Sequence, residues 1–192
     1  MSAMLTLKVL GIVGLLSLIV AYSSIALSIS ISPWFSWVEN ALSDLGARSP
    51  SSPLFNAGLI VSSALALMFA MGLRRVYRGA LGAAGTVLYA LSAVSLFMIG
   101  FFPETAGVVH YYSSVAFFVL VALTLVTFGA YGLAYRPRST KTGITVLILS
   151  ALAVAIWLLP WKGVAIPELF SSLTISAWTV IASVRMLRAR GQ

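Results

Sequence analysis

The chain contains 192 residues, of which 60% are hydrophobic and 8% are charged, and its formal net charge is +8. Soluble domains carry about 25% charged residues, so this composition excludes a soluble protein. A basic chain can also bind nucleic acid, but here the basic residues form short clusters between apolar runs, as membrane topology alone requires. We therefore expect an integral membrane protein with membrane lipids as partners and no nucleic acid.

Six apolar runs are each close to the roughly 20 residues that a helix needs to cross a bilayer. Short polar turns separate the runs and leave no room for a soluble domain. Residues 1–192 are thus expected to form one all-α, polytopic membrane domain, a bundle of six transmembrane helices. The predicted spans cover about residues 5–27, 54–73, 80–101, 108–133, 142–159 and 168–187.

Residues 33–45 predict a short additional helix on the outer face of the bundle. Ser32 followed by Pro33 is a helix start signal. In a helical projection the apolar residues of this stretch fall on one face and the polar residues on the other. Trp34 and Trp37 are typical of a helix that lies in the membrane interface.

The basic residues divide unevenly between the two sides of the predicted bundle. Only Arg48 and Lys162 lie on the side opposite the termini. The positive-inside rule then places both termini in the cytoplasm of a multi-pass cell-membrane protein, with all four acidic residues and His110 facing outward. The ten basic residues on the side of the termini are Lys8, Arg74, Arg75, Arg78, Arg136, Arg138, Lys141, Arg185, Arg188 and Arg190.

Polar residues that could bind a ligand or carry out chemistry gather at the expected outer ends of the helices. His110 and Ser114 are four residues apart and share one face of the fourth span. If the outer ends converge, a carboxylate, an imidazole and an amide meet in one pocket, which would bind a lipid head group or a small polar ligand. The candidate ligand-binding residues are Ser43, Asp44, Asn56, Glu104, His110 and Ser114.

Two other functions stay open at this point. His110, Glu104 and Asp44 could hold a divalent metal and activate water, which would make the protein a metal-assisted hydrolase or transferase acting on lipid. One histidine with scattered acids is a weak metal signal, and a chain without cysteine offers no thiolate site. No haem site is expected either. The other function is that of a non-catalytic accessory or assembly subunit; enzyme activity, a protein partner and a homo-oligomer remain undecided.

The acidic residues also have structural interpretations. Glu104 and Glu168 stand at expected helix N-termini, where the helix dipole stabilises a carboxylate, and for Glu168 this is the favoured interpretation. Asp44 would fall in the last turn of the 33–45 helix, where the dipole disfavours an anion. It therefore needs a counter-charge, with Arg48 or His110 as candidates.

Three stretches carry a resemblance to a known family: Asn40-Ala-Leu-Ser43-Asp44-Leu45-Gly46, Phe55-Asn56-x-Gly58, and Gly100-x-Phe102-Pro103-Glu104 with His110 downstream. They resemble a six-span prokaryotic membrane family that is known only as a domain of unknown function. That family is similar in layout to the eukaryotic DRAM/Sfk membrane proteins. The resemblance implies a six-helix fold with a polar outer cluster and offers no established activity.

Overall fold

The computed structural model describes residues 3–135 and 140–189 and is built from helices in these ranges. Six of the helices are long and apolar enough to cross a membrane, the fifth span being α6 extended by the short helix η3. The expected all-α, polytopic membrane fold is thus confirmed. The long helices are α1 (Ala3–Ser30), α3 (Ser52–Val76), α4 (Gly79–Phe101), α5 (Val108–Ala134), α6 (Thr140–Ala155) and α7 (Ala165–Leu187); the short ones are α2 (Asp44–Ala47), η1 (Glu104–Ala106) and η3 (Ile156–Leu158).

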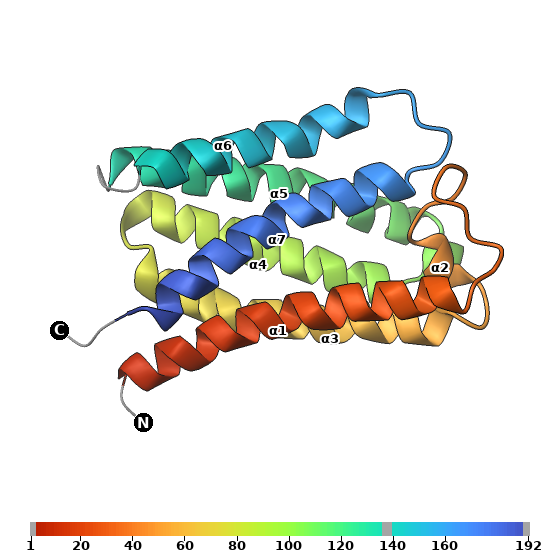
Figure 1. Cartoon of the computed structure of the whole chain (residues 1–192), viewed down its shortest axis with the longest axis horizontal. Coiled ribbons are helices and arrows are strands. Elements are labelled where there is room, and N and C mark those ends of the chain that lie inside the picture. Colours follow the sequence, from red (N-terminus) through yellow and green to blue (C-terminus); the bar gives the residue numbers. More distant parts are fainter. Residues whose placement is uncertain (1–2, 136–139, 190–192) are drawn as a thin grey trace.

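The long helices form a ring in chain order. Each packs against the next, and α7 closes the ring by packing against both α6 and α1. Both chain ends lie at one end of this bundle and α2 lies at the other, as Figure 1 shows. We call these the terminal end and the α2 end.

Proline, glycine and arginine residues set several helix boundaries. Pro53 occupies the first turn of α3, where a proline has no hydrogen bond to lose, and Arg74 and Arg75 occupy its last turn, where they complement the helix dipole. Gly107 precedes α5 with a φ of 61°, a backbone conformation that a residue with a Cβ rarely adopts. These signals explain why the observed spans agree with the predicted ones to within a few residues at most boundaries.

Aromatic rings fill the terminal half of the bundle. Trp178 is 1% exposed and stacks on Phe128 with ring centroids 4.2 Å apart. Tyr77 and Tyr89 pack on Trp178, and Phe69 packs on Tyr89. We call these five residues the aromatic cluster; stacked and edge-to-face rings of this kind contribute beyond their buried area.

The expected helix over residues 33–45 is wrong. The chain from residue 33 to residue 43 forms turns, and only α2 is helical in this region. The Asn40 side chain accepts a hydrogen bond from the backbone nitrogen of Ser36 at 2.8 Å, which is the local competition by which Asn disfavours helices. Asp44 consequently begins a helical turn instead of ending a helix.

The 33–43 segment is held by a second loop that is distant in the sequence. The backbone nitrogen of Gly163 donates to the Val38 carbonyl at 2.8 Å, and that of Ala165 donates to the Asn40 carbonyl at 2.9 Å. A Cβ atom at position 163 would lie 2.6 Å from the Asn40 backbone nitrogen, so the close approach of the two loops requires glycine. Backbone groups that a helix would have paired internally are paired between the loops instead.

Candidate ligand site

A groove of about 1060 Å³ opens at the α2 end, with α5 on one side and the end of α6 on the other. α5 and α6 lie close at the terminal end and separate toward the α2 end (Figure 1). Tyr111, Val115 and Val119 line the groove from α5, and Val154 and Trp157 line it from the facing span. Its walls are therefore mainly apolar or aromatic along most of their length.

The end of the groove nearest α2 is polar. Ser43, Glu104, His110 and Glu168 all line it, and they come from four separate elements of the chain. Ser114 lies one turn beyond His110 and also lines the groove. Four of the six candidate ligand-binding residues thus share one hollow, and we call its polar part the head pocket.

Asp44 reaches the head pocket indirectly, through a hydrogen bond between its carboxyl group and that of Glu104. One oxygen of Asp44 also accepts hydrogen bonds from the Asn40 side chain at 2.8 Å and from the Ala41 backbone nitrogen at 3.0 Å. These contacts hold the Asp44 carboxyl group in position beside Glu104.

The pKa of Glu104 is raised to about 7, although much of its side chain is exposed. Partial burial of the carboxyl group is the largest cause, followed by the hydrogen bond to Asp44 and the negative charge of Asp44. Arg48 acts in the opposite direction and lowers the pKa. Its guanidinium lies 4.7 Å from the ring centroid of Trp34, which fixes this cation beside the acidic pair.

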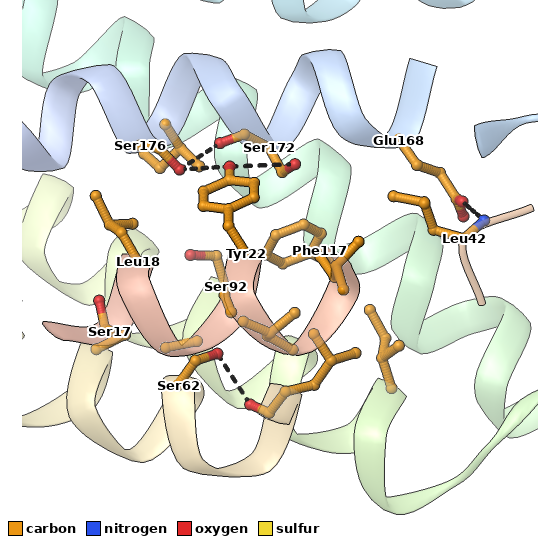
Figure 2. Close-up of a pocket in the computed structure, with 18 of the residues that line it drawn as sticks. Ser17, Leu18, Tyr22, Leu42, Ser62, Ser92, Phe117, Glu168, Ser172 and Ser176 are labelled. Atoms are coloured by element: carbon orange, nitrogen blue, oxygen red, sulfur yellow. Dashed lines mark hydrogen bonds between the residues drawn. The ribbon is translucent and has the colours of Figure 1, made fainter. Parts of the chain in front are cut away.

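Glu168 lies in the first turn of α7 and is 8% exposed. The expected interaction with its own helix terminus is only part of its environment. Its carboxyl group accepts a hydrogen bond from the backbone nitrogen of Leu42 at 2.6 Å (Figure 2). It accepts another from the backbone nitrogen of Ser43. Glu168 therefore ties α7 to the 33–43 segment and brings a third carboxyl group to the head pocket.

His110 is 6% exposed, and its Nδ1 lies 2.8 Å from the carbonyl oxygen of Phe102. A carbonyl only accepts hydrogen bonds, so Nδ1 carries the proton and Nε2 of the neutral ring is an acceptor. Nδ1 is thus bonded to the backbone carbonyl of Phe102 and not to the Asp44 carboxyl group, for which His110 was a candidate counter-charge.

An internal cavity of about 120 Å³ adjoins the groove and occupies the centre of the helix ring. Ser43, Ser114, Phe118 and Glu168 line both spaces. Phe118 packs on Trp157 with ring centroids 4.9 Å apart, and the Trp157 ring nitrogen donates to Ser171 at 2.8 Å. The Phe118–Trp157 pair, which the bond to Ser171 holds in place, thus lies where the cavity and the groove meet.

Hydroxyl groups from the neighbouring helices α1 and α7 meet in the cavity. Tyr22 of α1 projects between Ser172 and Ser176 of α7, with its oxygen 2.7 Å from that of Ser176 (Figure 2). Ser176 in turn donates to the Ser172 carbonyl at 2.8 Å. Tyr22 therefore acts as the donor to Ser176, and this bond links α1 to α7 within the hydrocarbon region.

The metal interpretation gains no support from the geometry. Across residues 3–135 and 140–189, no three His, Asp or Glu side chains are arranged so that they could hold a metal ion. His110, Glu104 and Asp44 lie in the same region, but the histidine is directed to a backbone carbonyl and the two carboxyl groups bond to each other. A metal at these residues stays a prediction from the sequence.

Asn56 has a structural position. Its side-chain nitrogen donates to the Gly46 carbonyl at 2.9 Å, which fastens α2 to the start of α3. It is absent from the lining of both the groove and the cavity, within the part of the chain that the structure describes. Of the six candidate ligand-binding residues, Asp44 and Asn56 do not line the hollow, and only Asp44 contacts a residue that does, through Glu104.

Sequence reasoning missed Glu168, Phe118 and Trp157 as members of this site. A signal for Glu168 was present, because Pro167-Glu168 repeats the dipeptide Pro103-Glu104. The first dipeptide lies in the first turn of α7 and the second lies just before α5, and both helices start at the α2 end. No comparable signal marks Phe118 and Trp157, since aromatic residues in a span are ordinary and their pairing depends on how α5 and α6 pack.

A family model described as "Protein of unknown function (DUF998)" matches residues 15–185 of the chain. No curated protein and no solved structure shows a significant match. The matched region includes all six predicted spans at least in part, and the candidate site lies inside it.

Proposed function

Because this chain belongs to the DUF998 family of membrane proteins, whose description names no activity, we propose a function from its own geometry: it binds a lipid in the groove between α5 and α6. The lipid's head group would occupy the head pocket and its chain would run along α5. The observation that carries this proposal is an apolar groove in a membrane-spanning bundle with polar groups gathered at one end.

The dimensions of the groove suit a lipid chain. Its lining on α5 extends from Gly107 to Leu123, which corresponds to about 24 Å of helix. The hydrocarbon core of a bilayer is about 30 Å thick, so the groove is long enough for an extended chain that enters from one leaflet. Its volume of about 1060 Å³ is at the upper limit of about 300–1,000 Å³ that is usual for small-molecule pockets.

The position of the groove supports binding from the bilayer. Tyr111 and Tyr112 are exposed beside the head pocket, and tyrosines at such positions favour the level of the lipid head groups. We further propose that the α2 end faces outward across the cell membrane, as the distribution of basic residues predicts, so that the lipid belongs to the outer leaflet. Arg136, Arg138 and Arg190, three of the ten basic residues that favour this orientation, lie outside the described residues.

Lipid retention by a groove-filled variant tests the proposal. We expect the protein purified in mild detergent to retain about one lipid in native mass spectrometry. Ala122→Trp fills the groove from α5 and should abolish this retention, whereas Val126→Trp, one turn further along α5 at an exposed position outside the groove lining, should leave it unchanged. Equal retention by both variants, or no lipid on the parent, would overturn the proposal and favour a non-catalytic accessory subunit.

A further inference from the structure

The head pocket is rich in hydrogen-bond acceptors. Glu104 and Glu168 contribute carboxyl oxygens, and Nε2 of His110 is the free acceptor of its ring. A ligand that fits such a set brings hydrogen-bond donors of its own. An ammonium group carries three donors and no acceptor, so it fits this set better than a phosphate or a carboxylate.

The charges of the head pocket favour the same ligand. Asp44, Glu104 and Glu168 interact electrostatically with one another, and Glu168 is affected by both of the other acids. Arg48 is the cation whose field reaches Glu104, and its guanidinium lies over the ring of Trp34. The carboxyl groups outnumber the one nearby cation, so the pocket favours a positive group, which would take the place of the proton on Glu104, and disfavours an anionic one.

Ser43 provides an observation that is independent of the acids. It is 8% exposed and lines both the groove and the cavity. Although it occupies the N-cap position of α2, its hydroxyl makes no capping hydrogen bond. Because Ser43 lines both hollows and its hydroxyl is not engaged in capping α2, this hydroxyl is available to a ligand in the groove.

The existing bonds limit where an ammonium group can bind. Asp44 already accepts two hydrogen bonds through one oxygen and bonds to Glu104, and one oxygen of Glu168 is occupied by the Leu42 backbone nitrogen. Glu104 and His110 both line the groove, and Nε2 of the neutral His110 ring is left as an acceptor by the bond that Nδ1 makes. Arg48 is not among the described residues that line the groove, but its charge acts on Glu104 and would favour a phosphate that follows the ammonium group in the same head group.

We propose that the head pocket selects a zwitterionic lipid whose head carries a primary ammonium group next to a phosphate, as in phosphatidylethanolamine. The inference rests on the proposed lipid-binding function and adds the chemistry of the head group. A choline head has the same charge but no N–H donors, so it cannot satisfy the acceptors. A glycerol head leaves the phosphate anion unbalanced beside three carboxyl groups.

Competition between lipids with identical chains tests this selectivity. The full-length protein in detergent is mixed with equal amounts of phosphatidylethanolamine, phosphatidylcholine and phosphatidylglycerol, and bound lipid is identified by native mass spectrometry. We expect the ethanolamine lipid to be favoured by about tenfold or more, the factor that one charge-assisted hydrogen bond supplies. Glu104→Gln should reduce this preference while lipid is still retained, and Glu39→Gln, an exposed acid on the neighbouring loop, should preserve it.

The outcomes separate this inference from the function on which it rests. Equal binding of the three lipids, or preference for the glycerol lipid, overturns the selectivity while lipid binding stands. Binding of none of them overturns both. Displacement of the ethanolamine lipid by millimolar phosphoethanolamine would support recognition of the ammonium group but overturn the lipid as its source, and failure of phosphoethanolamine to compete supports the lipid.

Discussion

Asp44 and Glu104 show how two acids can share one site at the edge of a membrane. The two carboxyl groups bond to each other, and Glu104, whose pKa is raised to about 7, still binds a proton near neutral pH. Arg48 and Glu168 also act on this pair, and His110 lines the same hollow. The charge of the pair therefore changes near neutral pH, whereas most carboxyl groups ionise at a much lower pH.

Glu104→Gln is expected to remove a pH dependence of stability. The folded-state pKa of Glu104 is about 7 and its ordinary value is 4.5, so between these values the folded protein holds a proton that the unfolded chain has released. The free energy of unfolding should fall as the pH rises through this window, and the loss is complete above about pH 7. Glu104→Gln should flatten the profile between about pH 4.5 and 8, measured as the thermal unfolding midpoint in detergent, while Glu39→Gln should leave it unchanged.

Asn56→Asp is expected to lower stability without affecting lipid retention. The substitution keeps the size of the side chain but replaces the donor to the Gly46 carbonyl with an acceptor. Loss of a partly buried hydrogen bond with one partner left unpaired costs about 1–3 kcal/mol. A lower unfolding midpoint with about one lipid still bound would fit this structural position, and loss of the lipid at an unchanged midpoint would contradict it.

At the scale of elements, two loops decide the shape of the site. The 33–43 segment is irregular because its backbone pairs with the loop before α7, and Glu168 completes the contact by accepting from Leu42. This contact thereby places Ser43 at the end of the groove nearest α2. The position of the head pocket thus depends on a contact between segments more than 100 residues apart.

Gly163→Ala should disturb this contact. The added Cβ would lie 2.6 Å from the backbone nitrogen and oxygen of Asn40, and backbone atoms cannot yield as a side chain end can. We expect faster hydrogen exchange of the Gly163 and Ala165 amides and a lower unfolding midpoint. Lys162→Ala, the neighbouring exposed position, is the control and should leave both unchanged; similar exchange in the two variants would count against the loop pairing.

The same loops mark the limit of what the sequence predicts. The six spans were predictable because each is a long apolar run with Pro, Gly or basic residues at its ends. The amphipathic pattern of residues 33–45 predicted a helix because the alternative partner, residues 163–165, lies far along the chain. Ser43, Glu104, His110 and Ser114 were predicted to lie together from their shared membrane level, whereas the structural position of Asn56 depends on a packing distance that no pattern encodes.

At the scale of the whole molecule, charge is divided between the two ends. The helix ends in Figure 1 place the acids at one end and most of the basic residues at the other. Among the described residues, Glu39, Asp44, Glu104 and Glu168 lie in or near α2, η1 and the start of α7, together with Arg48 and Lys162, whereas Lys8, Arg74, Arg75 and Arg185 lie near the start of α1 and the ends of α3 and α7. Such a division is typical of a membrane protein whose basic end remains in the cytoplasm.

Single cysteines should report this orientation directly, because the chain has no cysteine of its own. A cysteine at Ser49 is exposed at the α2 end, and a cysteine at Arg188 is exposed at the terminal end. In intact cells we expect Ser49→Cys to react with a membrane-impermeant maleimide and Arg188→Cys to react only after the membrane is permeabilised. The reverse pattern would place the groove in the inner leaflet.

The aromatic cluster bounds the internal cavity on the side that faces the terminal end. It lies directly beyond the deepest lining of the cavity, where Tyr89 belongs to both, and Arg185 packs over the Tyr77 ring 5.6 Å from its centroid on the far side. Within the described part of the chain, the stacked pair Trp178 and Phe128 lies beyond Tyr89 on the side of the cavity that faces the terminal end. A molecule that passed from the cavity to the terminal end along this path would first require these two rings to separate, whereas exchange through the groove leaves the cluster intact.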